Sequence, residues 1–276
     1  MTWWARTLTC GSIALLLLAA SAELLGQSSM DLIGSRRRAR GQAVAPVFEG
    51  WAPNPDGTFS LHFGYMNRNW EEEVDIPIGP NNFFEPGPQD QGQPTHFLTN
   101  RQKKNFAVVV PKDFGSKTLT WTLIRSGSTE RVPGKLGLIF QIDATKTNDS
   151  VAPILTMGPP QTVVFPQAAT LMATVADAGQ PKAGRGGRPA VLTVKWRQYR
   201  GPGKATFDDP APPLKDGKTV TNVTVSQPGI YQFQALAENG SSSDGGLTGG
   251  IPCFMCCWTT AQMTVTVNPA PGSGPR

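Results

Sequence analysis

Apolar and polar residues alternate in short stretches along the first half of the chain, as they do in β-strands with one buried face. In the clearest stretch, Phe59, Leu61 and Phe63 fall on one side and the polar residues between them on the other. The predicted strands of this half cover residues 58–65, 74–78, 105–111, 117–125 and 136–142. Turn-forming residues separate them and no helical periodicity interrupts them, so the half is predicted to be all-β.

The second half repeats this organisation around two aromatic residues. Its predicted strands cover residues 162–165, 169–175, 192–196, 219–226, 230–235 and 259–267. Trp196 lies on one of them and Tyr231 begins another after a Pro-Gly turn. Immunoglobulin-like sandwiches build their core around such a Trp on one central strand and a Tyr on its neighbour. We therefore expect both side chains to be buried and close, in an all-β protein of two β-sandwich (Ig-like) domains in tandem after a signal peptide.

The N-terminus has the features of a secretory signal. Arg6 precedes an apolar run over residues 13–20, and Ala20-Ser21-Ala22 is a small-x-small cleavage site. The run is shorter than the roughly 20 apolar residues of a membrane anchor. We expect a signal peptide over residues 1–22, export to the periplasm, cell surface or medium, and no transmembrane anchor afterwards.

The remaining domain boundaries follow from composition. We predict a disordered basic linker at residues 23–43, sandwich domains at 44–147 and 153–268, and a disordered tail at 269–276. The linker contains Arg36, Arg37, Arg38 and Arg40, for which a solvated linker is favoured over contact with anionic lipid or polysaccharide. The net charge of +5 is too mild to indicate a nucleic-acid partner.

One predicted connection is unusually long. Residues 79–104 exceed the roughly 12 to 15 residues of ordinary loops. They contain four ring side chains, which argue against plain disorder: Phe83, Phe84, His96 and Phe97. The loop either folds these rings under the sheet or presents them as a ligand-binding surface, and both interpretations stay open.

Catalytic and metal-binding patterns are weak. The sequence has two histidines, and His62, His96 and Glu85 have no spacing typical of a zinc site. We expect no metal, no cofactor and no catalytic residues. The carboxylates of Glu71-Glu72-Glu73 are expected to be solvated, and Asp208-Asp209 to cap a turn in preference to binding calcium.

The cysteines predict a covalent link near the C-terminus. Removal of the signal peptide would leave Cys253, Cys256 and Cys257, an odd number in an oxidising compartment. A bridge between neighbours 256 and 257 needs a distorted turn, whereas Cys253 and Cys256 span a loop that is easier to close. We expect one local disulfide that fixes the entry to the last strand, with one thiol left over.

Two resemblances extend this interpretation. The order of residues 171–177, 194–196, 201–203 and 226–231 resembles PKD-type and bacterial Ig-like domains of cell-surface proteins, although Arg197-Gln198-Tyr199 stands where the PKD motif has acidic residues. Residues 47–142 resemble an uncharacterised module of exported bacterial proteins. The ending Cys256-Cys257-Trp258-Thr259 is similar to theirs as well, which implies a local bridge involving the Cys pair.

These features together predict an exported, non-catalytic binding or structural protein. The expected partner is a polysaccharide or another cell-surface protein, with the first domain carrying any recognition. The alternative is an accessory subunit or a small hydrolase with its site in residues 79–104.

Overall fold

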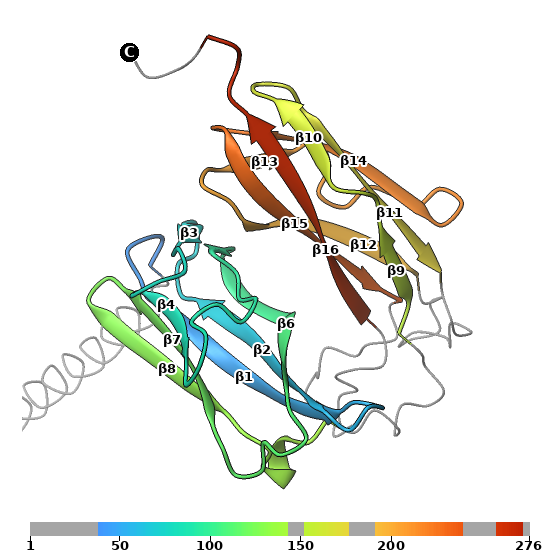
Figure 1. Cartoon of the computed structure of the whole chain (residues 1–276). Coiled ribbons are helices and arrows are strands. Elements are labelled where there is room, and N and C mark those ends of the chain that lie inside the picture. Colours follow the sequence, from blue (N-terminus) through green and yellow to red (C-terminus); the bar gives the residue numbers. More distant parts are fainter. Residues whose placement is uncertain (1–37, 143–151, 177–190, 240–257, 273–276) are drawn as a thin grey trace, which may run out of the picture. The chain divides into compact units, whose positions relative to one another are not determined.

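The computed structural model describes residues 38–142, 152–176, 191–239 and 258–272 (Figure 1). Its regular elements are β-strands and one short 3₁₀ helix. A search of these residues finds no helix of the length and apolar character that a membrane span requires. The predicted signal peptide, most of the predicted linker and all cysteines lie outside the described residues.

Three sheets build the first domain. Strands β1 (Val44–Pro53), β2 (Phe59–Asn67) and β6 (Asn100–Val110) form one antiparallel sheet in the order β1-β2-β6. Strands β4 (Asn82–Glu85), β7 (Leu119–Arg125) and β8 (Ser128–Gly134) form a second, in the order β4-β7-β8. A third pairs β3 (Val74–Asp75) with β5 (His96–Phe97).

Aromatic rings fill the core between these sheets. Trp121 is fully buried, with Phe84 and Phe97 stacked at centroid distances of 5.8 and 6.3 Å and Phe106 edge-on at 5.1 Å. Its indole nitrogen donates to the Asn82 side chain at 3.0 Å, which satisfies the one polar atom of the ring. Rings contributed by all three sheets thus hold this domain together.

The second domain is a sandwich of two four-stranded sheets. One has the order β13 (Ala205–Phe207), β14 (Lys218–Val225), β11 (Ala169–Ala176), β9 (Ile154–Met157). The other has the order β10 (Gln161–Val164), β16 (Trp258–Asn268), β15 (Gly229–Glu238), β12 (Thr193–Arg200), with β10 parallel to β16. If the strands other than β10 are lettered along the chain, the first sheet has the spatial order D-E-B-A and the second the order G-F-C, as in the immunoglobulin fold. Strand β10 is an added edge strand beside β16.

The predicted aromatic core of the second domain is confirmed. Trp196 and Tyr231 are 3% and 0% exposed and belong to one hydrophobic cluster. The Tyr231 hydroxyl donates to the backbone oxygen of Gln227 at 2.8 Å, which is the tyrosine corner of immunoglobulin domains. Phe233 lies two residues further on, where antibody domains have a disulfide cysteine; it is fully buried, with its ring centroid 5.7 Å from that of Phe207 and 6.1 Å from that of Tyr231.

The all-β fold class and its sandwich domains are confirmed, while some local predictions are corrected. Residues 136–142 were expected to be a strand, but they form the 3₁₀ helix η1 (Leu138–Phe140) and a single bridge from Gln141 to Trp51. Leu138 and Ile139 are 84% and 88% exposed, because this run has no alternation to give it a buried face. The long connection 79–104 contains β4, β5 and the start of β6.

Candidate functional site

The connection between β4 and β5 contacts the second domain, and both domains belong to one compact unit over Arg40–Arg276. Tyr199 of β12 packs in the core cluster of the first domain and is 1% exposed. Its hydroxyl donates to the backbone oxygen of Gly92, and its own backbone oxygen accepts from the Thr95 amide at 3.1 Å. The connection between β4 and β5 is therefore bound by strand β12 of the second domain.

Arg200 makes the neighbouring contact. Its two terminal nitrogens donate to the Asp90 carboxylate at 2.9 and 2.7 Å, and its Nε donates to the Gln93 backbone oxygen at 2.8 Å. Two parallel bonds between a guanidinium and a carboxylate fix direction as well as distance. The hydrogen bonds from Arg200 hold the pKa of Asp90 below its ordinary value.

A series of buried hydrogen bonds extends the contact between the two domains. Arg197 is 9% exposed, and its Nε donates to the Gln234 side chain at 2.7 Å. The Gln234 amide nitrogen donates to the Asn105 backbone oxygen at 2.8 Å, and an Arg197 terminal nitrogen lies 3.3 Å from the Gln102 side-chain oxygen. Burial lowers the pKa of Arg197, and electrostatic interactions with Tyr65, Tyr199 and Glu238 oppose this in part.

Two buried amide side chains order the connection from within. Asn82 donates to the backbone oxygens of Ile76 and Pro94 at 2.9 and 2.8 Å. Gln93 is 0% exposed, donates to the Gln89 backbone oxygen and accepts from the Gln91 amide. The segment that meets β12 is therefore pre-organised by the first domain itself.

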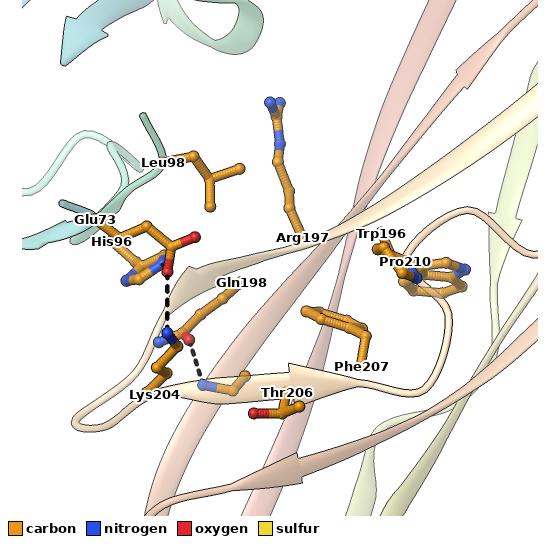
Figure 2. A pocket seen from close by; sticks show the side chains of 11 residues that line it. Glu73, His96, Leu98, Trp196, Arg197, Gln198, Lys204, Thr206, Phe207 and Pro210 are labelled. Atoms are coloured by element: carbon orange, nitrogen blue, oxygen red, sulfur yellow. Dashed lines mark hydrogen bonds and ion pairs between the residues drawn. The ribbon is translucent and has the colours of Figure 1, made fainter. Parts of the chain in front are cut away.

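A cavity of about 400 Å³ lies next to these contacts (Figure 2). Both domains line it, through Glu73, His96, Leu98, Trp196, Arg197, Gln198, Lys204, Ala205, Thr206, Phe207 and Pro210. Its size is within the range of small-molecule sites, roughly 300–1,000 Å³. It is the candidate binding site.

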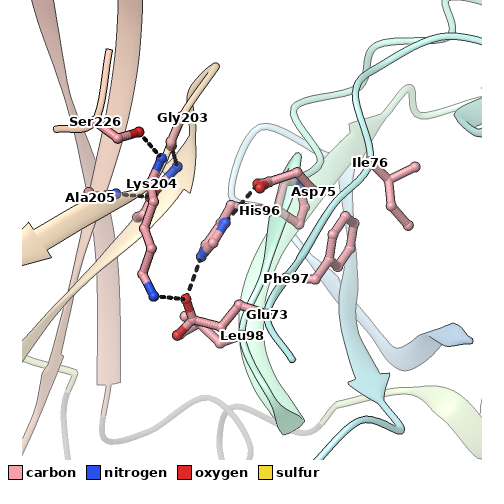
Figure 3. Close-up of polar contacts among 12 residues, drawn as sticks. Glu73, Asp75, Ile76, His96, Phe97, Leu98, Gly203, Lys204, Ala205 and Ser226 are labelled. Carbon is pink, nitrogen blue, oxygen red and sulfur yellow. Dashed lines mark hydrogen bonds and ion pairs between the residues drawn. The ribbon is translucent and has the colours of Figure 1, made fainter. Parts of the chain in front are cut away.

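His96 forms the polar centre of this cavity (Figure 3). Its Nδ1 lies 2.7 Å from the Asp75 carboxylate and its Nε2 lies 3.5 Å from the Glu73 carboxylate, while Lys204 Nζ lies 3.9 Å from Glu73. Burial alone would lower the pKa of His96, but the two carboxylates raise it to about 9. The ring is therefore protonated at neutral pH, with Nδ1 hydrogen-bonded to Asp75 and Nε2 ion-paired with Glu73.

Of the two interpretations of residues 79–104, the structure favours the one in which the connection folds its rings under the sheet. Phe84 and Phe97 are 1% and 0% exposed in the aromatic core, and Phe83 is half-buried on β4. Their burial follows from packing against Trp121. Of the four candidate ligand-binding residues, only His96 lines the cavity.

Other predicted residues are not brought together. His62 was expected on a polar strand face, but it is 6% exposed, and burial lowers its pKa to about 4. Among the described residues, no cluster of His, Cys, Asp and Glu could hold a metal ion. The disulfide candidates Cys253, Cys256 and Cys257 lie outside the described residues.

The acidic run 71–73 is not simply solvated, which corrects the prediction. Glu73 faces His96, and Glu72 accepts from Arg125 at 2.9 Å and from the Gly41 amide at 2.7 Å. Asp209 does cap a turn, since its carboxylate accepts from the Ala211 amide at 2.8 Å. Two neighbouring glutamates of this run therefore take part in two separate contacts.

Sequence reasoning did not place Glu73, Arg197 and Lys204 in one site, because these residues are far apart in the chain and lack a spacing motif. A single signal was available. Arg197-Gln198-Tyr199 departs from the PKD-type pattern, and these residues are buried against the first domain or beside the cavity.

Comparisons with known proteins do not assign the chain to a family. No protein-family model matches the chain, and no curated protein matches it. A crystal structure of a mutant complex of titin M10 with the immunoglobulin domain of obscurin-like 1 is similar at 18% identity and a TM-score of 0.27, over 45% of this chain and 99% of its own. The immunoglobulin class of the second domain rests on its strand order and its tyrosine corner.

Proposed function

We propose that the chain is an exported, non-catalytic protein of the cell surface or periplasm, in which the two sandwiches act together as one binding or structural body. The observation that carries this proposal is the docking of Tyr199 and Arg200 on the connection between β4 and β5. Sandwiches that serve as independent spacers would not need a buried contact of this kind.

The arrangement around His96 supports a non-catalytic role. A His–Asp contact of 2.7 Å has the geometry of a base and its orienting carboxylate. A general base must be unprotonated at the working pH, whereas the pKa of His96 is raised to about 9. Glu73 also lies at the second ring nitrogen, where a nucleophile or a substrate proton would have to be.

Polysaccharide or another cell-surface protein remains the proposed partner, and nucleic acid is not proposed. The alternative, a small hydrolase with its site in residues 79–104, has one supporting feature, the Asp75–His96 contact. A turnover assay on polysaccharides and simple esters separates the two. We expect no product above the level of a His96→Gln control, and turnover that the substitution abolishes would establish the hydrolase.

Export is tested on its own. N-terminal sequencing of the protein from cell fractions should begin at Glu23, because cleavage is predicted after Ala22. A cytoplasmic protein that retains Met1 would contradict the proposed location.

A further inference from the structure

The two ends of the cavity differ in chemistry. Figure 2 shows Trp196, Phe207 and Pro210 on one side, and His96, Glu73 and Lys204 on the other. Phe207 is half-buried and packs edge-on against Phe233 at 5.7 Å, so its ring is held in place. A ligand that fills the cavity would meet an apolar, partly aromatic wall and a charged wall.

The charged wall carries more positive than negative groups. His96, Arg197 and Lys204 are the basic residues of the lining, and Glu73 is its one carboxylate. Asp75, outside the lining, pairs with His96. Glu238, also outside the lining, interacts electrostatically with Arg197. Asp75 and Glu238 therefore balance His96 and Arg197, while Glu73 lies near both His96 and the exposed Lys204.

Lys204 is the cation best placed to meet a ligand. Its side chain is 71% exposed, and its ammonium group lies 3.9 Å from Glu73, beyond hydrogen-bonding distance. No described residue accepts a hydrogen bond from it. Arg197, in contrast, donates to Gln234 and Gln102.

The turn that carries Lys204 is firmly built. The Gln198 side chain donates to the Gly203 backbone oxygen at 2.7 Å and accepts from the Ala205 amide at 2.8 Å. Ser226 accepts from the Lys204 amide and donates its own amide to the Lys204 backbone oxygen, both at 2.9 Å (Figure 3). The lysine backbone is therefore fixed, as a binding group requires.

We propose that this cavity binds a small organic anion, a ring-shaped body that carries a carboxylate, with the carboxylate on Lys204 and the ring against Phe207. Carboxylates form their stronger hydrogen bonds with charged donors. Both aromatic rings and sugar rings pack on aromatic side chains, so an aromatic acid and a uronic acid share this chemistry. The proposal rests on the proposed binding role of the chain.

Isothermal titration calorimetry of the mature protein at pH 7 tests it with two pairs of probes. The first pair is 2-naphthoate and its neutral amide, and the second is digalacturonate and its neutral dimethyl ester. We expect at least one carboxylate to bind about tenfold more tightly than its neutral partner. The pair that shows this preference distinguishes an aromatic acid from a uronic acid.

Substitutions in the cavity lining test whether the ligand binds at Lys204 and Phe207. Lys204→Gln should weaken binding of the preferred carboxylate about fivefold and leave its neutral partner unchanged, because only the charge contact is lost. Lys215→Gln is the matched control, since Lys215 is exposed and lies outside the cavity lining, and it should change the affinity less than about twofold. Phe207→Ala should weaken acid and neutral probe alike, with folding checked by circular dichroism.

Equal affinity within both pairs, no binding of either carboxylate at millimolar concentration, or equal effects of Lys204→Gln and Lys215→Gln would each overturn the proposal. The turnover assay gives an independent result. If it shows no product while the carboxylates fail to bind, the non-catalytic role stands and this ligand class does not.

Discussion

At the scale of single residues, the second domain depends on the pair that the sequence already indicated. Trp196→Ala should lower the free energy of unfolding by about 3 to 5 kcal/mol, because the ring is 3% exposed and its removal leaves a cavity in the core. Denaturant unfolding measures the loss. Met172→Ala is the control, since Met172 is 40% exposed and its loss should stay below about 0.5 kcal/mol. A similar small loss for both variants would contradict the described core.

His96 and His62 should make the free energy of unfolding depend on pH in opposite directions. The pKa of His96 is raised to about 9, so its contribution is complete below pH 6.5 and is lost as pH rises through 9. The pKa of His62 is lowered to about 4, so stability falls as pH drops below 6.5 toward 4. Stability should therefore be greatest near pH 6.5.

Substitution of one histidine at a time should remove the alkaline or the acid decline of stability separately. Shifts of this size correspond to about 3 kcal/mol across each pH interval. In unfolding experiments, His96→Gln should abolish the decline between pH 6.5 and 9, and His62→Phe should reduce the decline below 6.5. An unchanged alkaline decline in the His96→Gln protein would show that His96 is not held between Asp75 and Glu73.

At the scale of elements, most strands could be predicted from sequence because their buried faces alternate. Strand β11 has a strictly alternating burial pattern, as the alternation of Leu171, Ala173 and Val175 indicates. Strands β4 and β5 are four and two residues long, too short for a pattern to stand out. The strand predicted over residues 74–78 is shorter than expected, because β3 covers only Val74–Asp75. Strand β8 was missed because it is mostly polar, and every second residue, on its inner face, is only half-buried until the buried Gly134.

The candidate site was predictable only in part. His96 was singled out as a ring in a long connection, and it lines the cavity. Glu73, Arg197 and Lys204 meet it through contacts between strands that are distant in sequence, and no periodicity encodes such a meeting. Burial of Arg197 and Tyr199 also breaks the strand pattern, since both faces of β12 are covered where it meets the first domain.

The contact between β12 and the β4–β5 connection can be measured by a double-mutant cycle. Asp90→Ala, Arg200→Ala and the double variant should give a coupling free energy of about 1 kcal/mol, because the bidentate pair is partly screened. The Asp113–Lys117 pair is the control: both side chains are well exposed and 3.4 Å apart, and their coupling should be near zero. Equal coupling in the two cycles would contradict a specific docking contact.

At the scale of the whole molecule, the described contacts make the two sandwiches depend on each other. Gly201 shows how closely the docking strand is also tied to its own core, because a Cβ atom there would come within 2.2 Å of the Tyr231 ring. The same short segment therefore packs on the tyrosine corner at Gly201 and on the first domain at Tyr199. A substitution that disturbs the packing of this segment on one domain should therefore also destabilise the other domain.

Tyr199→Ala tests this dependence. Tyr199 belongs to a strand of the second sandwich but is buried in the core cluster of the first, so its loss should weaken the attachment and the first domain together. In differential scanning calorimetry the parent protein should unfold in one transition, because neither sandwich can lose the shared contact alone. The variant should show two transitions, with the first domain unfolding at the lower temperature.

Tyr231→Phe is the matched control for this experiment, because it removes a hydroxyl bond of similar kind inside the second sandwich. It should cost about 1 kcal/mol and leave a single transition at a lower temperature. Two transitions already present in the parent protein would mean that the sandwiches unfold independently. In that case the docking of Tyr199 and Arg200 would not bind the domains into one body, and the proposed joint role would fail.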